Sequence, residues 1–322
     1  MSVVSVRGLR KSYGSLTAVD DVSFEVQRGE VFALLGPNGA GKTSTIEILE
    51  GFRGRDGGEV RVLGIDPGVR STQRWLRSQL GVVLQELAVE PFLSVRQVLT
   101  RNAGYYPAPR PVEEVIELIG LAEKADAKVK TLSGGQQRRL DVGLGIVGAP
   151  ALLFLDEPTT GLDPAGRRMS WELLQRLAGE GTTVILTTHY MDEAEALAQR
   201  VAIIARGRIV ADGAPDTIGG RDRGAATIRF RLPSDAGAEE LPEECFEADA
   251  QVRRDDGGAV EIQTDEEVRV LHALTGWAQE RGVALAGLTV RRNTLEDVYL
   301  RLTGGDPERE RAGAEAELVR SR

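Results

Sequence analysis

The sequence predicts an α/β protein in which helices cover a largely parallel sheet, followed by a smaller α+β domain. The first observation is a series of short apolar, β-rich runs that alternate with helical or glycine-rich stretches. The second is a glycine-rich motif, GPNGAGKT, that stands between a predicted strand and a predicted helix. The third is a change of composition at TIGGRDRGA, residues 217–225, beyond which a new set of strands begins.

Strands and helices of the first part follow from periodicity. Alternating apolar residues in VVSVRGL, VSFEVQ and EVRVL predict a small antiparallel sheet. Short β-rich runs predict the strands of the main sheet: VFALL (31–35), GVVL (81–84), ALLFL (151–155), TTVILT (182–187) and VAIIA (201–205). Four apolar residues at helical spacing predict an amphipathic helix over 112–121: Val112, Val115, Ile116 and Ile119.

The segments beyond the change of composition predict a small α+β domain. Strands are expected at TIRFRL, AVEIQT and LAGLTV, and helices at about 265–281 and 294–303. The last segment, DPERERAGAEAELVRSR, is highly charged and poor in apolar residues, which predicts a flexible tail. We therefore expect a first domain over 1–220, a second over 225–304 and a tail over 305–322.

Charge and composition narrow the class of protein. The chain has 322 residues and a net charge of −9, from 40 basic and 49 acidic residues, which argues against a nucleic-acid-binding protein. No apolar run approaches the roughly 18 residues of a membrane span, and the first segment lacks the apolar core of a signal peptide. The single cysteine, Cys245, allows no internal disulfide and has no metal-ligand spacing around it. A cytosolic protein is expected.

The motif GPNGAGKT (36–43) fits the pattern G-x-x-x-x-G-K-[ST] and leads into the helical run TSTIEILEG. Its glycines let backbone N–H groups turn toward phosphates, and the helix N-terminus adds its dipole. Lys42 would bring a positive charge to the outer phosphates, and Thr43 a hydroxyl to Mg²⁺. The predicted nucleotide-binding residues here are Gly36, Asn38, Gly39, Ala40, Gly41, Lys42, Thr43 and Ser44. The alternative is a glycine-rich strand-to-helix turn without a ligand.

Two carboxylates end a predicted strand. Asp156 and Glu157 follow the apolar run ALLFL, and Asp156 comes 114 residues after Lys42. Ligands of open α/β sheets bind beyond such strand ends, and a phosphate loop requires a carboxylate there for Mg²⁺, which we assign to Asp156. Because side chains alternate along an extended segment, Glu157 is expected to face another way and to accept the proton of an attacking water. The alternative is a pair of solvated carboxylates.

A second loop with the chemistry of a phosphate cradle, but without a lysine, occurs in TLSGGQQRRL (131–140). Ser133 and Gln136 fit the capping box S-x-x-Q at a helix N-terminus. A cap requires neither Gly134 nor Gly135, whereas close backbone approach to a ligand does. Farther along, glycines at 143, 145 and 148 predict a softer or closely packed helix, because each costs up to about 1 kcal/mol relative to alanine.

Together, GPNGAGKT, LSGGQ, LFLDEPTTGLD and TTHYMDEAEAL resemble the ATPase subunits of ABC transporters in order and spacing, over roughly residues 3–215. The resemblance implies a P-loop NTPase cassette with a mixed sheet core, an antiparallel β subdomain and a helical subdomain at about 86–147. It also implies ATP and Mg²⁺ as cofactors and ATP hydrolysis as the reaction.

The resemblance assigns roles to further residues. Tyr13 would stack on adenine, and Gln85 would reach the Mg²⁺ site and link it to a transmembrane partner. Asp163 would lie in the loop that crosses to the opposite subunit, and His189 would contact the γ-phosphate. Their structural alternatives are a half-buried tyrosine, a polar strand end, a turn-forming Asp-Pro pair and a structural histidine. The predicted catalytic residues are Glu157, His189 and Gln85, and the predicted Mg²⁺ ligands are Thr43, Gln85 and Asp156.

The resemblance also implies partners. In this family two chains meet head to tail, so that each ATP lies between GPNGAGKT of one chain and LSGGQ of the other. A homodimer that ATP closes and hydrolysis releases is therefore expected. The C-terminal segment NTLEDVYLRLTGGD resembles the daunorubicin-type branch of bacterial drug exporters, whose membrane-spanning subunit is a separate chain. This implies a place at the cytoplasmic face of the membrane.

Alternatives remain open both for the C-terminal segment and for the function of the chain. The local alternative for the C-terminal segment is a helix that Thr294 and Asp297 cap and that carries an apolar stripe. The functional alternatives are an importer ATPase and an ABC ATPase that acts on DNA or ribosomes. DNA-acting members carry a long coiled coil before LSGGQ, whereas only about 90 residues intervene here. Ribosome-acting members usually carry two cassettes, and this chain carries one, so no nucleic-acid partner is expected.

Overall fold

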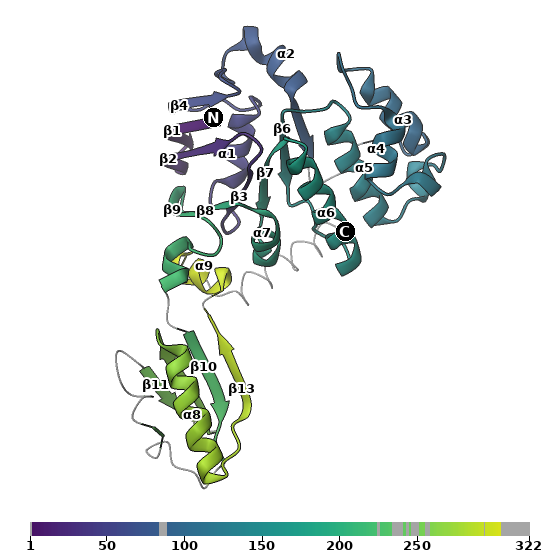
Figure 1. Ribbon diagram of the computed structural model, residues 1–322. Coiled ribbons are helices and arrows are strands. Elements are labelled where there is room, and N and C mark those ends of the chain that lie inside the picture. Colours follow the sequence, from purple (N-terminus) through teal and green to yellow (C-terminus); the bar gives the residue numbers. More distant parts are fainter. Residues whose placement is uncertain are drawn as a thin grey trace. The chain divides into compact units, whose positions relative to one another are not determined.

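The computed structural model describes residues 2–83, 89–223, 226–233, 241–242, 245, 251–254, 258–292 and 294–303. Its contacts divide the chain into a first unit that ends at Pro215 and a second unit over Asp216–Arg301, with Leu302 and Thr303 grouped with the first. The first unit combines two sheets with a set of helices, and the second combines one sheet with a long helix (Figure 1). The predicted α/β class is confirmed.

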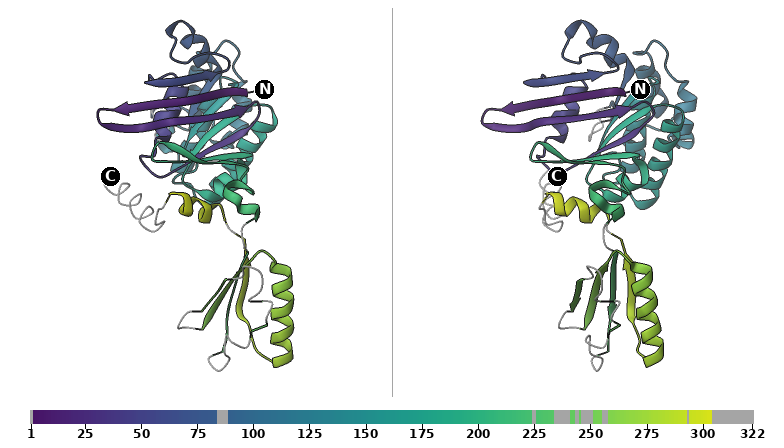
Figure 2. Two further views of the ribbon diagram at one scale, coloured as in Figure 1. Left: turned by 90° about the vertical axis from the view of Figure 1, so that its left-hand side faces the viewer. Right: turned by 60° about the vertical axis from the view of Figure 1, so that its left-hand side comes forward.

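The first unit opens with an antiparallel sheet of three strands in the order β2-β1-β4. These strands are β1 (Ser2–Tyr13), β2 (Leu16–Gln27) and β4 (Gly57–Val62). Figure 2 shows β1 and β2 as a long pair, in purple. One face is buried because apolar residues alternate with more exposed ones, as in Val22, Phe24 and Val26. The expected antiparallel sheet is therefore present.

The main sheet has six strands in the order β5-β6-β7-β3-β8-β9. They are β3 (Val31–Leu35), β5 (Leu80–Val83), β6 (Leu152–Asp156), β7 (Thr183–Thr188), β8 (Arg200–Ala205) and β9 (Arg208–Gly213). The first five run parallel, and β9 pairs antiparallel with β8. Every residue of β3 and β7 is buried, as expected of parallel strands covered on both faces.

Seven α-helices in the described part of the first unit accompany this sheet (Figure 1). They are α1 (Lys42–Leu49), α2 (Arg70–Gln79), α3 (Val95–Ala103), α4 (Val112–Leu118), α5 (Gly134–Ile146), α6 (Pro164–Gly179) and α7 (Met191–Leu197), with 3₁₀ turns η1 (Ala122–Lys124) and η2 (Val129–Thr131). Helices α3, α4 and α5 pack on one another. The helix expected over 112–121 ends earlier, at Leu118, because Gly120 adopts a left-handed φ of 63° that closes the helix.

One apolar core joins the antiparallel sheet, α1 and a face of the main sheet. The rings of Phe24 in β2 and Phe32 in β3 stack across it, with centroids 5.1 Å apart. This packing fixes the start of α1 and the end of β3 relative to the antiparallel sheet. The residues that connect β3 and α1 are the motif GPNGAGKT.

The glycines of α5 have a packing reason. A Cβ atom added at Gly145 would lie 2.6 Å from Cγ2 of Val83, and one at Gly143 would lie 2.9 Å from Cδ1 of Ile119. Side chains at these positions would separate α5 from β5 and from the end of α4. Of the two alternatives expected for this helix, close packing is therefore the one found.

The second unit is an antiparallel sheet in the order β11-β12-β10-β13. Its strands and helices are η3 (Ile218–Arg223), β10 (Ala226–Arg231), β11 (Gln251–Arg254), β12 (Ala259–Thr264), α8 (Glu267–Arg281), β13 (Ala286–Arg291) and α9 (Leu295–Thr303). Apolar residues of β10, β12 and α8, among them Phe230, Ile262 and Leu274, form its core. The predicted cap of the last helix is present, because Thr294 Oγ1 accepts from the Asp297 N–H at 3.1 Å.

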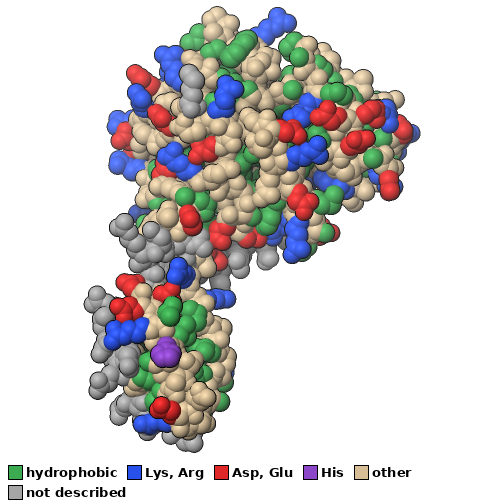
Figure 3. Space-filling view, viewed as in Figure 1, with side chains coloured by type: hydrophobic (Ala, Val, Ile, Leu, Met, Phe, Trp, Pro, Cys, Tyr) green, Lys and Arg blue, Asp and Glu red, His purple; other side chains and the backbone are tan. Residues whose placement is uncertain are grey.

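Two surface properties bear on partners. Within the described residues, no helix combines the length and apolar character that crossing a membrane requires. Figure 3 shows basic and acidic side chains interspersed over the visible face of the first unit, with no large field of one sign.

Candidate active site

Two glycines of the phosphate loop have a backbone conformation that other residues rarely adopt. Gly39 and Gly41 have left-handed φ values of 79° and 104°. A Cβ atom at Gly41 would also lie 2.3 Å from the carbonyl oxygen of Ala18, and one at Gly36 would lie 2.4 Å from that of Ile204. Gly41 is the N-cap of α1, so the loop leads its backbone N–H groups into a helix N-terminus. This is the geometry of an anion-binding cradle.

Lys42 holds its ammonium group against the same loop. Its side chain is buried, and Nζ donates to the carbonyl oxygens of Gly36 and Pro37. Thr43 is exposed and Ser44 is half-buried, so both hydroxyls lie near the surface of the loop. The residues that the motif predicted as nucleotide-binding are thus together in one turn.

Tyr13 lies beside this turn although it comes from the end of β1. Its hydroxyl is 3.0 Å from Oγ of Ser44, and the residue is 38% exposed. The cationic groups of Lys11 and Arg53 lie 5.5 Å and 5.2 Å from the ring centroid. An accessible aromatic face next to the phosphate loop is what stacking on a base requires; that role remains a prediction.

Asp156 and Glu157 differ in backbone conformation. Asp156 is the last residue of β6, and Oγ1 of Thr187 in β7 donates to its carboxylate. Glu157 lies beyond the strand with a left-handed φ of 49°, and its N–H donates to the Thr187 carbonyl at 3.0 Å. The sequence argument that strand alternation separates the two side chains is wrong, because a left-handed turn sets the direction of Glu157.

The carboxylate of Glu157 is half-buried between two other polar groups. Nδ1 of His189, which follows β7, lies 3.0 Å from Oε1, and Oγ1 of Thr160 donates to Oε2 at 3.2 Å. Burial acts to raise the pKa of Glu157, but the His189 hydrogen bond and charge, with Thr160 and Lys42, lower it below its usual value. The side chain is therefore ionised at neutral pH and able to accept a proton.

The LSGGQ segment forms the capping box that the sequence predicted. Ser133 accepts from the Gln136 N–H at 3.3 Å, and the Gln136 side chain accepts from the Ser133 N–H at 2.9 Å. The two glycines between them have no role in packing this chain. A Cβ atom at Gly134 would meet nothing within 4 Å, and one at Gly135 would make an ordinary contact of 3.4 Å with Leu162. The space over Gly134 is open, and a side chain at Gly135 would fit beside Leu162.

Comparison with known proteins identifies the family. The family model for ABC transporters matches residues 19–160, and a model for the C-terminal domain of ABC transporter domain-containing proteins matches residues 226–294. A Nod factor export ATP-binding protein I from Burkholderia thailandensis is 40% identical over 311 residues, covering 94% of this chain and 98% of that protein. The chain belongs to the ABC transporter ATP-binding family.

Other relatives agree with this assignment. A daunorubicin/doxorubicin resistance ATP-binding protein from Streptomyces peucetius is 38% identical over 322 residues, covering 97% of this chain and 96% of that protein. A solved ATP-binding subunit of an ABC transporter is 25% identical, with a TM-score of 0.61 over 66% of this chain and 90% of its own. The protein is accordingly an ABC-type ATPase with an ATP-binding cassette and a C-terminal domain.

Asp163 and Gln85 were also predicted to belong to the site, and the structure describes only Asp163. Asp163 is the N-cap of α6, where Oδ1 accepts from the Gly166 N–H at 2.7 Å, so the turn chemistry anticipated as an alternative is present. Its contact with an opposite subunit remains a prediction. Gln85 lies outside the described residues, and its roles also stay predictions.

Sequence reasoning missed four buried charged residues near these loops: Arg138, Asp141, Glu193 and Glu50. Arg138 in α5 donates to the carbonyl oxygens of Asp156, Glu157 and Pro158. Glu193 in α7 is fully buried, and burial raises its pKa. Glu50, the C-cap of α1, is buried, and burial, followed by the charges of Glu47 and Asp156, raises its pKa to about 8. Only the spacing of Arg138 and Asp141, which pair at 2.9 Å, was visible in the sequence.

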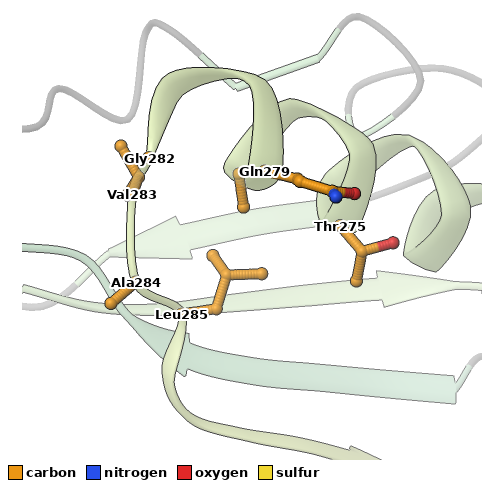
Figure 4. Close-up of a pocket in the computed structure, with 7 residues that line it drawn as sticks. Thr275, Gln279, Gly282, Val283, Ala284 and Leu285 are labelled. Carbon is orange, nitrogen blue, oxygen red and sulfur yellow. The ribbon is translucent and has the colours of Figure 1, made fainter.

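A hollow elsewhere offers no comparable chemistry. It lies in the second unit between the end of α8 and the segment that leads to β13, with a volume of about 440 Å³ (Figure 4). Its lining has no ionisable side chain: Thr275, Ala278, Gln279, Gly282, Val283, Ala284 and Leu285. The groups suited to nucleotide chemistry are those of the first unit.

Proposed function

We propose that this ABC ATPase drives export of a drug-like or other hydrophobic compound through a separate membrane-spanning subunit. The relatives that match nearly the whole chain, C-terminal domain included, carry names that refer to export and to drug resistance. In this proposal two copies of the chain act as a homodimer at the cytoplasmic face of the membrane. The observation that carries the ATPase site is the ionised Glu157 beside His189, at the same end of the main sheet as the phosphate loop.

ATP would bind at the residues gathered around α1. The backbone of Gly36–Thr43 would surround the phosphates, with Lys42 as the positive charge and Tyr13 against the base. Mg²⁺ takes oxygen ligands, and the hydroxyl of Thr43 with the carboxylate of Asp156 are of this kind, with Gln85 as the third proposed ligand. When bound, the ion would neutralise charge on the phosphates.

Glu157 would act as the general base. Its carboxylate is ionised at neutral pH and is held through Oε1 and Oε2 by His189 and Thr160, so it can take the proton of a water that attacks the γ-phosphate. General-base catalysis contributes roughly 10²–10⁴-fold. His189 would contact the γ-phosphate once ATP is bound.

The LSGGQ segment would complete the site of the partner subunit. Ser133 and Gln136 already cap α5, and the open space over Gly134 is available for another molecule. In a head-to-tail dimer that molecule is the ATP held by the partner's phosphate loop, and Asp163 would cross the same interface. ATP would then favour the closed dimer, and hydrolysis would release it.

The test is Glu157→Gln. This variant should bind ATP, hydrolyse it scarcely, and accumulate as an ATP-bound dimer in size-exclusion chromatography. Full turnover would contradict the role of Glu157 as general base. An inactive variant that stays monomeric in the presence of ATP would contradict the proposed homodimer. Co-purification of the wild type with a six-helix-type membrane protein supports export, whereas binding to DNA or ribosomes supports the non-transport alternative.

A further inference from the structure

Arg138 connects two segments that the proposed function places in different ATP sites. It lies in the second turn of α5, the helix whose N-cap is Ser133 of the LSGGQ segment. Its guanidinium group reaches the loop after β6 and donates to the backbone carbonyl of Glu157. One rigid helix therefore carries both the loop for the partner's nucleotide and a contact to this chain's own candidate base.

The contacts of Arg138 are directed at backbone carbonyls. Nε donates to Pro158 O at 2.9 Å, and one terminal nitrogen, Nη2, donates to Asp156 O at 2.8 Å and to Glu157 O at 2.9 Å. The other, Nη1, donates to Asp141 Oδ2 at 2.9 Å, which fixes the plane of the guanidinium group. Arg138 is only 9% exposed, so these bonds are made away from solvent.

The loop that receives these bonds has an unfavourable conformation. Glu157 is not glycine, yet its φ is 49°, and such a residue keeps a left-handed backbone only when its surroundings hold it there. Its N–H donates to Thr187 O, and its carbonyl accepts from Arg138, so both ends of the residue are fixed. Without the second bond, the loop can relax toward an ordinary φ and turn the carboxylate away from His189.

We propose that Arg138 is a positioning residue: it holds the backbone of Glu157 so that the carboxylate stays beside His189 and faces the attacking water. The inference rests on the proposed role of Glu157 as general base. Lysine cannot replace the arginine, because a single ammonium nitrogen cannot span three successive carbonyls and a carboxylate in the plane of a guanidinium fork.

The chain offers a matched control next to it. Arg139, also in α5, donates from Nη1 to Ile119 O at 3.3 Å and to Gly120 O at 3.0 Å, at the end of α4. It is an arginine of the same helix that also bonds to backbone carbonyls, but these carbonyls belong to the end of α4 and not to the Glu157 loop. Arg139→Lys therefore measures what loss of such a bond does to α5 alone.

The first experiment compares steady-state ATP hydrolysis by Arg138→Lys, Arg139→Lys and the wild type. For Arg138→Lys we expect kcat to fall about tenfold to a hundredfold while KM and the equilibrium affinity for ATP change less than about twofold, since misplacement of a reacting group affects the chemical step. Arg139→Lys should keep the wild-type kcat. Equal loss in both variants, or a loss of ATP affinity with unchanged kcat in Arg138→Lys, overturns the proposal.

A double-mutant cycle separates positioning from a general structural role. In single-turnover measurements, adding Arg138→Lys to Glu157→Gln should leave the residual hydrolysis rate unchanged, because no base remains to be positioned. A further tenfold loss in the double variant would show that Arg138 acts elsewhere. An inactive Glu157→Gln together with a fully active Arg138→Lys refutes only this inference, whereas a fully active Glu157→Gln refutes the proposed function itself.

Discussion

Nδ1 of His189 lies 3.0 Å from Oε1 of Glu157, so the residue that follows β7 holds the residue that follows β6. The two residues are 32 positions apart in the sequence and meet because β6 and β7 are parallel neighbours. Parallel neighbours end at the same edge of a sheet, and the residues after them therefore share one environment. The same edge carries the phosphate loop, since β3 pairs with β7 on its other side.

Replacing His189 should change both the rate and its pH dependence. The His189 contact is the largest of the effects that lower the Glu157 pKa, and burial, which raises it, would remain in His189→Ala. The pKa of Glu157 should then rise, and the acid limb of the kcat–pH profile should move to higher pH, with kcat at neutral pH reduced roughly tenfold or more. ATPase assays between pH 5 and 8 measure both effects.

The chain contains one other histidine for comparison. His272 is exposed on α8 of the second unit, so His272→Ala should reproduce the wild-type profile. An acid limb that stays in place in His189→Ala would show that the contact does not govern the ionisation of Glu157.

The elements that the sequence predicted are those whose residues are buried in a regular pattern. Continuous apolar runs marked β3 and β8 because covered parallel strands bury almost every residue. Strands β9 and β11 were not expected, since RIVADG is only half-buried and QVRR has a single apolar residue. The strand-to-helix turn of the phosphate loop was predicted because a short motif specifies its local backbone geometry.

The contacts missed at the candidate site join segments that are distant in sequence. Arg138 meets the carbonyl of Glu157 19 positions away, and nothing in QQRRL distinguishes it from an exposed helical arginine. The left-handed φ of Glu157 was also unforeseen, because an Asp-Glu pair at a strand end is compatible with extended backbone. Both features depend on how α5 docks, which three-dimensional packing alone decides.

Glu50 predicts an unusual dependence of stability on pH. Burial, and then the charges of Glu47 and Asp156, raise its pKa from 4.5 to about 8, so the folded chain binds a proton that the unfolded chain releases between these values. The contribution of Glu50 to the free energy of unfolding should therefore fall as pH rises from 4.5 to 8. Glu50→Gln, which is neutral at every pH, should be more stable than the wild type at pH 8–9 by on the order of a few kcal/mol.

Urea denaturation of the wild type and Glu50→Gln at pH 5, 7 and 9 measures this difference. The gain from the substitution should be small at pH 5 and should grow toward pH 9. Glu117→Gln, the same chemical change at an exposed position of α4, should show no such trend. A constant difference between Glu50→Gln and the wild type at all three values of pH would contradict the prediction.

Two capping boxes in the described part of the chain make it possible to separate stability from function at the LSGGQ segment. Ser133 caps α5 with Gln136, and Ser94 caps α3 with Gln97, in both cases with side-chain and backbone bonds in each direction. Replacing the serine by alanine removes one bond to an N–H group of the first helical turn, which costs about 1 kcal/mol of stability at either site. Ser133→Ala and Ser94→Ala should therefore lower the free energy of unfolding by similar amounts.

Their effects on ATP hydrolysis should differ. If Ser133 also faces the partner's ATP, Ser133→Ala should lower kcat and weaken the ATP-dependent dimer in a Glu157→Gln background, whereas Ser94→Ala should leave both unchanged. The comparison holds the helix-capping chemistry constant, so a difference in activity can come only from what each serine meets beyond its own helix. Equal kcat values in the two variants would restrict Ser133 to capping and would leave the open space over Gly134 without a ligand.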